Sequence, residues 1–226
     1  MTGTVDFRPQ TGTLVAPPPV FEALLTGKPD PELESAGAVR GDTAHPALQG
    51  ALRAVAEPHA ALVLERGDRR GYGWAGPEGV TALLLPLPDG RRRLITVRTQ
   101  FVPDALARIN DVAPRPRVEP AVRIRLSVPD LAAALAARDP AGAATDEPEA
   151  FASLLDSLSE HWRAEARWPP AEGSPGVRSV EVLDTTEGLW LVIPDAPSVE
   201  LWPTTPTTVF RALCGLLPFD HEVRAP

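Results

Sequence analysis

Residues that could carry chemistry are few and far apart in this chain of 226 residues. No two histidines have the spacing that places two ligands on one helical face, and no cysteine pair accompanies them, as a zinc site would require. Cys214 lies in an apolar segment near the C-terminus, where a free cysteine usually behaves as a small hydrophobic residue. The sequence therefore predicts no metal site and no cofactor. The histidines are His45, His59, His161 and His221.

The glycines and carboxylates also lack a catalytic context. Four glycines between residues 71 and 79 are flanked by predicted strands on both sides, whereas a phosphate-binding loop joins a strand to a helix, so hairpin turns explain them better. No Gly-x-Ser-x-Gly motif is present. Asp184 and Glu187 are expected in a turn, and Glu147 and Glu149 at a helix start. We predict no catalytic residue and expect the protein not to be an enzyme.

The composition excludes several classes of protein. The net charge is −8, from 22 basic and 30 acidic side chains, whereas a nucleic-acid-binding protein needs a positive field. The single cysteine allows no intramolecular disulfide, and Lys28 is the single lysine, which is typical of an arginine-rich, GC-rich coding genome. No apolar run approaches the roughly 18 residues of a membrane span, and no signal peptide is recognisable. We therefore expect a cytoplasmic protein without membrane insertion.

The elements that would position any site begin with helices. Residues 1–18 are polar and then proline-rich, and we predict that they form a flexible arm. Apolar spacing predicts helices over residues 20–27 and 45–57, and a short helix over residues 31–36 that Asp30 caps.

From residue 60 the pattern changes to that of extended strands. Four runs of strand-forming residues are separated by short turns that contain glycine, which predicts an antiparallel meander. The predicted strands cover residues 61–66, 70–75, 80–85 and 92–98.

The second part of the chain is also predicted to contain both helices and strands. Strict alternation of apolar and polar residues predicts a strand over residues 122–128, and helical spacing predicts the longest amphipathic helix over residues 149–167. The other predicted elements are helices over 103–114, 129–138 and 207–217, a linker over 169–176, and strands over 177–183, 189–193 and 198–202. Local strand pairing with separately grouped helices predicts an α+β fold, in which helices flank antiparallel sheets.

A weak internal repeat relates the two meanders. Residues 96–114 align without a gap on residues 200–218, which places Leu106 opposite Phe210. Any strand followed by a helix can give this apolar pattern, so a true repeat and a chance match are both open. A true repeat predicts two related sheet-and-helix halves with pseudo-twofold symmetry.

The aromatic residues give a signal for binding. Tyr72 and Trp74 stand in one predicted strand, and such residues are common in the energetic centre of protein interfaces. The alternative is that they pack in the core, as we expect for most of the five tryptophans.

Two segments resemble the EspG family, proteins associated with ESX, or type VII, secretion in actinobacteria. In the first segment, Leu33 to Leu126, the matching parts are Ala36–Val39, His45–Leu48, Leu52–Pro58, the strands from Ala61, the helix start at Val102–Pro103, and Val118–Leu126. In the second segment they are Val180–Thr185, Gly188, Trp202–Pro203 and the end of the last helix at Leu216–Pro218.

The resemblance implies a fold and a function. The fold is a single EspG-like α+β domain over residues 19–218, with related halves at about 19–128 and 129–218 and a tail at 219–226. The function is that of a cytosolic chaperone or adaptor, which binds PE/PPE-type secretion substrates and covers an apolar patch at the tip of their helical bundle. The implied partner-binding residues in the first meander are Arg69, Arg70, Tyr72, Trp74, Pro77 and Glu78.

Alternatives to this function are open. The short turns of the first meander make a small helical WXG100-like protein an alternative partner, and a homodimer is a further alternative. A small-molecule or lipid-binding α+β domain without catalysis would have a pocket between the long helix and a sheet. A hydrolase would need a deep pocket with converging polar groups.

Overall fold

The computed structural model describes residues 4–28, 30–119, 121–169, 174–219 and 222–223, and it has the predicted α+β class. The chain divides into two compact units. The first consists of Met1–Ala105, Glu165–Arg178 and Leu217–Pro226, and the second of Leu106–Ala164 and Ser179–Leu216. Among the described residues, no helix is both long and apolar enough to cross a membrane.

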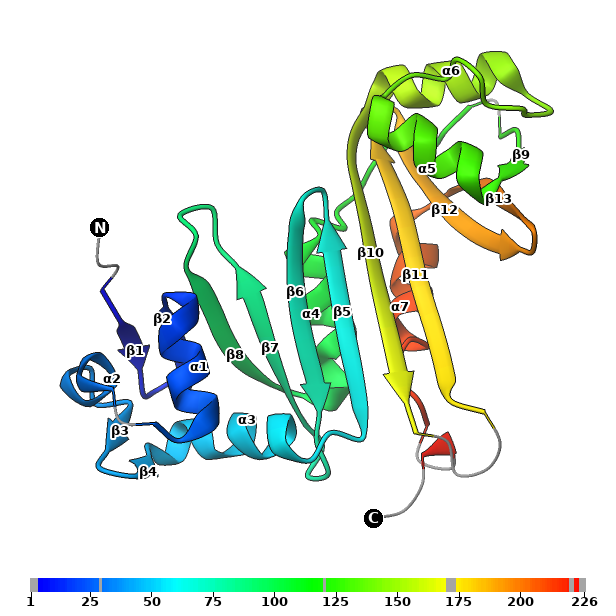
Figure 1. The fold of residues 1–226 in the computed structure, drawn as a ribbon. Coiled ribbons are helices and arrows are strands. Elements are labelled where there is room, and N and C mark those ends of the chain that lie inside the picture. Colours follow the sequence, from blue (N-terminus) through cyan, green and yellow to red (C-terminus); the bar gives the residue numbers. More distant parts are fainter. Residues whose placement is uncertain (1–3, 29, 120, 170–173, 220–221, 224–226) are drawn as a thin grey trace. The chain divides into compact units, whose positions relative to one another are not determined.

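The first unit contains the predicted meander (Figure 1). Its strands β5 (Ala60–Arg66), β6 (Arg69–Ala75), β7 (Val80–Pro86) and β8 (Arg92–Arg98) pair antiparallel in chain order. Gly67, in the turn between β5 and β6, has a φ of 57°, and Gly79, in the turn between β6 and β7, has a φ of 64°. The sequence therefore predicted this sheet correctly, because each turn has a residue suited to it.

Helices cover one face of this sheet. They are α1 (Pro18–Thr26), α2 (Pro31–Ser35) and α3 (Pro46–Ala56), with the short hairpin of β3 (Val39–Arg40) and β4 (Thr43–Ala44) between α2 and α3. Asp30 caps α2 as predicted, since its side chain accepts hydrogen bonds from the backbone N–H groups of Glu32 and Leu33. Leu48, Ala51 and Ala54 of α3 pack in one apolar cluster with residues of β2, β7 and β8.

The prediction that residues 1–18 form a flexible arm is wrong. Strand β1 (Asp6–Arg8) pairs with β2 (Thr13–Ala16), which pairs with β8 through Leu14 and Leu94. Leu14 is fully buried. Prolines 17 to 19 suggested a disordered segment, but they end β2 and begin α1, where the first turn of a helix tolerates proline.

The second unit contains most of β11 (Gly176–Thr185), which pairs antiparallel with β12 (Gly188–Asp195), followed in order by β13 (Ser198–Thr204) and β9 (Ile124–Ser127). Helices α5 (Val128–Ala137) and α6 (Pro148–Ser157) pack on one face, where Leu131, Phe151 and Trp190 belong to one buried cluster. A 3-10 turn (Thr99–Phe101) and α4 (Val102–Ile109) follow β8, and α7 (Pro206–Cys214) follows β13.

The predicted long helix over residues 149–167 is wrong in its second half. Helix α6 ends at Ser157, and Leu158–Trp168 form strand β10. Trp162, Ala164, Ala166 and Trp168 are all buried, so the period of two outweighs the helical spacing that Leu158 and Trp162 also satisfy.

The chain contains the same order of elements twice. The first copy is β2–α1–α3–β5–β6–β7–β8–α4, with α2 and the β3–β4 hairpin inserted, and the second is β9–α5–α6–β10–β11–β12–β13–α7. In each copy the first strand pairs antiparallel with the last, β2 with β8 and β9 with β13. Strand β9 therefore belongs to the second copy, not to a first half that ends at residue 128.

The internal repeat fits better with a shift of one residue between the two final helices. Leu106 of α4 and Val209 of α7 are both fully buried, whereas Phe210, which the ungapped alignment places opposite Leu106, is half-buried. The predicted linker 169–176 and tail 219–226 lie partly outside the described residues, as does His221.

Candidate functional site

Strand β6 places the predicted aromatic residues on one face of the first sheet. Arg70, Tyr72 and Trp74 alternate with the buried Gly71, Gly73 and Ala75, as side chains on successive strand residues must. The rings of Tyr72 and Trp74 are stacked, with centroids 6.2 Å apart and planes inclined by 25°. Both side chains are half-buried, which leaves part of each ring accessible to a partner.

Two arginines flank the Tyr72 ring. The guanidinium carbon of Arg70 lies 5.9 Å from the ring centroid, and that of Arg92, on β8, lies 5.7 Å from it. Both distances are within the range of cation–π attraction. Arg70, Tyr72 and Trp74 thus form a continuous row along β6, with Arg92 beside it.

The opposite face of β6 explains two glycines that the sequence assigned to turns. A Cβ atom on Gly73 would lie 2.7 Å from Cδ2 of Leu83 and 3.0 Å from Leu62, so only glycine lets these two leucines meet across the strand. The assignment to hairpin turns is therefore wrong for Gly71 and Gly73, which lie within the strand. The glycines leave a flat, tightly packed support behind the aromatic row.

The structure does not bring all six predicted partner-binding residues together. Arg69, Arg70, Tyr72 and Trp74 lie on β6, but Pro77 and Glu78 lie beyond its other end, in the turn before β7. Glu78 forms an exposed ion pair with Arg53 of α3. Because a strand rises about 3.3 Å per residue, Arg69 and Glu78 are at opposite ends of a strand about 20 Å long.

The sequence reasoning missed Arg92. Alternate turns of a meander lie at the same end of the sheet, so the turns at residues 67–68 and 88–90 had to be neighbours. The register confirms this, because Tyr72 is opposite Leu84 and Pro86 is opposite Arg92. The Arg91–Arg93 run after the second turn was the available signal.

A second cluster of charges, in the second unit, is structural. Arg115 donates to both carboxylate oxygens of Asp184, at 3.3 and 3.2 Å, and also to Asp111. The hydrogen bond to Asp184 raises the pKa of the Arg115 guanidinium further above its usual value, and the Asp111 bond adds to this. Asp184 was expected in a turn, but it lies buried in β11 and holds the segment after α4.

His45, His161 and Cys214 lie on different elements of the structure. Among the described residues, no three histidine, cysteine or carboxylate side chains are grouped as a metal site would need. His45 caps α3, since its Nδ1 accepts a hydrogen bond from the N–H of Ala47. Nε2 of His161 lies 2.9 Å from Oε1 of Glu181, at hydrogen-bond distance. Cys214 is exposed on α7, so the expectation that it packs as a small hydrophobic residue is wrong.

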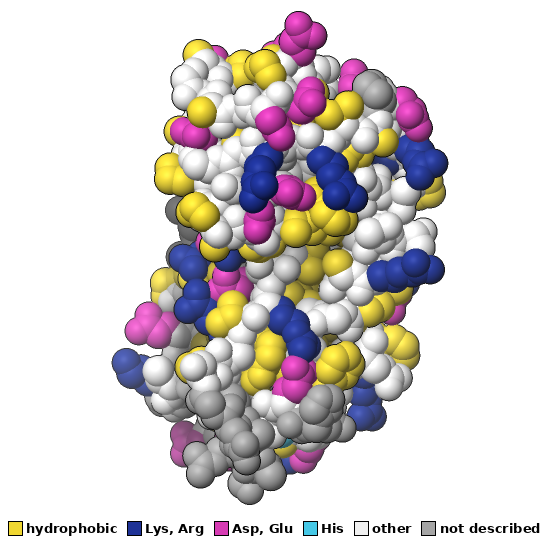
Figure 2. All heavy atoms as spheres, turned by 90° about the vertical axis from the view of Figure 1, so that its right-hand side faces the viewer, with side chains coloured by type: hydrophobic (Ala, Val, Ile, Leu, Met, Phe, Trp, Pro, Cys, Tyr) yellow, Lys and Arg dark blue, Asp and Glu magenta, His cyan; other side chains and the backbone are white. Residues whose placement is uncertain are grey.

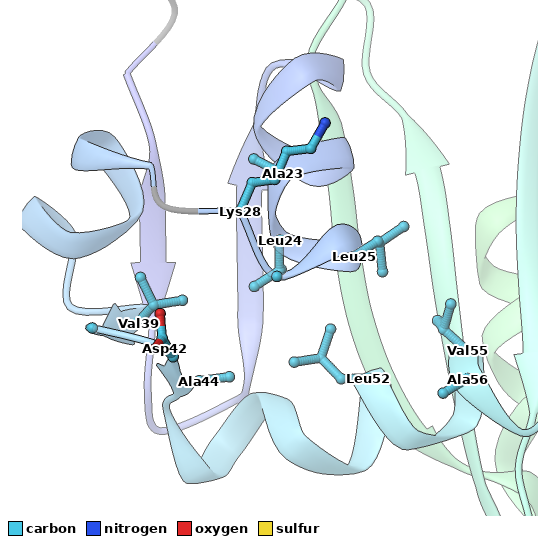
Figure 3. A pocket seen from close by; sticks show the side chains of 12 residues that line it. Ala23, Leu24, Leu25, Lys28, Val39, Asp42, Ala44, Leu52, Val55 and Ala56 are labelled. Carbon is cyan, nitrogen blue, oxygen red and sulfur yellow. The ribbon is translucent and has the colours of Figure 1, made fainter.

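An apolar cavity of ≈ 330 Å³ lies between α1, the β3–β4 hairpin and α3 (Figure 3). Leu25 and Leu52 extend into the space between the two helices, and Leu25 is 41% exposed. Lys28 and Asp42 supply its charged groups. A second, more open pocket of ≈ 570 Å³ lies beside the helix for which a pocket was expected, where residues of α6 such as Ala152 and Ser153 line it together with Thr186 and Glu187.

Figure 2 shows a different face of the molecule, where hydrophobic side chains lie in patches between arginine and carboxylate side chains. In the second unit, the guanidinium carbon of Arg123 lies 3.9 Å from the centroid of the Trp202 ring. Trp202 also donates a hydrogen bond from Nε1 to Glu200. Here the indole is engaged by its own neighbours on both its face and its edge.

The fold defined by these elements is similar to that of a solved type VII secretion chaperone. The comparison is with a solved structure of the Mycobacterium tuberculosis chaperone EspG5 in complex with the PE25–PPE41 dimer. The two chains share 12% sequence identity with a TM-score of 0.58, and the match covers 92% of this chain and 97% of that one. No protein-family model and no curated protein sequence matches the chain. The predicted resemblance to the EspG family is thus confirmed at the level of the fold.

Proposed function

We propose that the protein is a cytosolic, EspG-like chaperone or adaptor of a type VII secretion system. The observation that carries this proposal is the similarity of fold to EspG5 over nearly the whole length of both chains. EspG5 was solved in complex with a PE25–PPE41 dimer, so we infer a PE/PPE-like secretion substrate, with a WXG100-like helical protein as the alternative. The chaperone would cover an apolar patch on this helical substrate and keep it soluble for export.

The proposed binding surface is the aromatic row of β6. Tyr72 and Trp74 are stacked and only partly buried, and stacked aromatic side chains lose little conformational entropy when a partner covers them. Arg70 extends the surface at one end of β6, and Arg69, whose side chain starts from the opposite face of the strand, would reach a partner only around that end. Pro77 and Glu78, at the other end, would belong to it only for a partner that spans the whole strand.

Co-expression tests the proposal. The tagged protein would be co-expressed with each PE/PPE-like and WXG100-like protein encoded in the same locus, and we expect one of them to co-purify. The double variant Tyr72→Ala/Trp74→Ala should lose this partner. The matched control is Phe101→Ala, because Phe101 is also an exposed aromatic residue, at 53%, but lies outside the row. Failure of every candidate to co-purify would contradict the proposal.

A second candidate function rests on the apolar cavity between α1 and α3. Its volume of ≈ 330 Å³ is within the range of ligand pockets, and most of its lining side chains are apolar. A non-catalytic domain could hold a small apolar molecule or one lipid chain there. Native mass spectrometry of the purified protein should then show a retained mass, which Leu52→Trp would displace by filling the cavity. The chaperone function predicts no retained ligand.

A further inference from the structure

Arginines gather at one end of the first sheet. The turn between β5 and β6 carries Arg66, Arg69 and Arg70, and the start of β8 carries Arg91, Arg92 and Arg93. Both turns lie at the same end of the sheet, as the pairing of Tyr72 with Leu84 requires (Figure 1). The end therefore combines six arginines from segments more than 20 residues apart in the sequence.

The local charge is opposite to that of the whole chain. Within residues 65–70 and 89–93, six arginines accompany three carboxylates, a surplus of three positive charges in a chain of net charge −8. At an ionic strength of about 0.1 M, charges more than about 10 Å apart are largely screened, so a bound partner senses this local surplus more than the distant acidic residues.

The carboxylates at this end neutralise only some of the arginines. The backbone N–H and the guanidinium of Arg91 both donate to Asp89, and these bonds hold the pKa of Asp89 below its usual range. Nε of Arg70 lies 3.6 Å from Oε1 of Glu65, and both side chains are about half exposed. Such a surface ion pair contributes little to stability, so Arg70 can pair with a partner's carboxylate instead. Arg92 makes no ion pair with any residue that the structure describes.

The geometry around Tyr72 selects for a particular anion. Arg70 and Arg92 lie on the same sheet face as Tyr72, each with its guanidinium carbon within 6 Å of the ring centroid. The two guanidinium groups are thus at most about 12 Å apart. On a helix, side chains four residues apart have Cβ atoms about 6 Å apart. Two long Glu side chains one helical turn apart could each reach one of the guanidinium groups, while an apolar side chain on the same helix face packs on the stacked rings of Tyr72 and Trp74.

We propose that Arg70, Arg92 and the Tyr72–Trp74 row bind an acidic amphipathic helix of a protein partner. The helix presents two carboxylates one turn apart, with an apolar residue between them. This inference rests on the proposed function, because it names the chemistry of the substrate surface that the chaperone recognises. Nucleic acid would also be attracted to arginines and aromatic rings, so the test below includes it.

The test uses synthetic helical peptides of about 20 residues, a length at which helices form in isolation. One peptide carries Glu at positions i and i+4 with Leu between them, and its matched control has Gln in place of every Glu. Fluorescence anisotropy at about 50 mM salt should show the Glu peptide binding about tenfold more tightly than the Gln peptide. Raising the salt to about 500 mM should remove most of that difference, because exposed charges are screened.

Variants locate the binding site. Arg70→Glu/Arg92→Glu should abolish the preference for the Glu peptide. The control, Arg108→Glu/Arg117→Glu, makes the same change of charge at two exposed arginines outside the first sheet, and it should change the affinity less than about twofold, as surface charges at a distance do. Circular dichroism would show that each variant is folded.

Three results would overturn the inference: equal binding of both peptides, no binding of either, or tighter binding of a 20-base-pair DNA duplex. The outcomes separate the inference from the proposed function. If a helical partner co-purifies while the peptides bind equally, the function stands and the acidic chemistry is wrong. If the Glu peptide binds while no partner co-purifies, the site stands and the secretion role is wrong.

Discussion

In the first repeat, Tyr72 and Trp74 are only partly buried on the sheet, whereas in the second repeat Trp162 and Trp190 are 2% and 5% exposed. Trp190 packs in the cluster that α5 and α6 cover, and Trp202 is engaged by Arg123 and Glu200. Two arginines also differ in how they are paired. Arg115 of the second unit donates a hydrogen bond to the buried carboxylate of Asp184, whereas Arg92 of the first unit makes no ion pair with a described residue. The two repeats share an order of elements, but Trp190 is enclosed in the core of the second, whereas Tyr72 and Trp74 of the first are only partly buried, with Trp74 packed against the edge of its core.

Truncation of a core aromatic residue in the second repeat should have the largest effect on stability. Phe151 of α6 is fully buried, so Phe151→Ala should lower the free energy of unfolding by about 4 kcal/mol through lost burial and the cavity left behind. Chemical denaturation followed by circular dichroism measures this. The control, Phe101→Ala, removes a side chain that is 53% exposed and should cost less than about 1 kcal/mol. Equal effects would show that this core does not stabilise the fold.

The ion pairs of the two repeats should differ next. Arg115→Ala leaves Asp184, with a side chain 12% exposed, without its bidentate partner, and should cost about 3 kcal/mol. Arg53→Ala breaks the pair with Glu78, whose side chains are 52% and 57% exposed, and should cost less than about 1 kcal/mol. Thermal denaturation of both variants measures the difference. If Arg53→Ala were the costlier change, the assignment of structural charges to the second repeat would be wrong.

Gly73 tests how tightly side chains pack on the face of β6 opposite the aromatic row. Gly73→Ala places a Cβ against Leu83 and Leu62 and should cost about 2 kcal/mol through overpacking. Gly71→Ala is the matched control within the same strand, because its nearest contacts, at 3.2 to 3.4 Å, are less severe. It should cost about half as much, as measured by the same denaturation experiment. An effect at Gly71 that exceeds the one at Gly73 would contradict the packing described for this sheet face.

The helix caps should give the smallest effect. Ser127 caps α5 by accepting a hydrogen bond from the N–H of Asp130 at 3.1 Å, whereas α1, its counterpart in the first repeat, begins after Pro17 without a side-chain cap. Ser127→Ala should cost about 1 kcal/mol. Ser159→Ala, at an exposed position of β10, is the control and should leave the melting temperature unchanged.

Much of the fold was predictable because local signals and tertiary packing agree. Each turn between the strands β5 to β8 contains a glycine, and Asp30 is a typical N-cap residue directly before α2. The segment from Leu158 to Trp168 was not predictable, because its apolar residues fit both a helical and an extended period until the buried faces are known. Strand β2 was missed because it has four residues and is stabilised by β8, almost 80 residues later in the chain.

The candidate site was predictable only in part. Tyr72 and Trp74 were recognised by residue type, and their common face follows from strand alternation. The position of Arg92 beside them depends on register across three strands, and the separation of Pro77 and Glu78 depends on the length of β6. Neither register nor strand ends are reliably fixed by a single sequence.

Hydrogen exchange tests most directly whether the first repeat carries the binding surface. Amide exchange would be measured with and without a PE/PPE-like protein encoded in the same locus. We predict slower exchange in Arg69–Ala75 and Arg92–Arg98 on addition of the partner, with little change in Gly188–Asp195 and Ser198–Thr204. Protection confined to the second repeat, or no protection in either, would contradict the account.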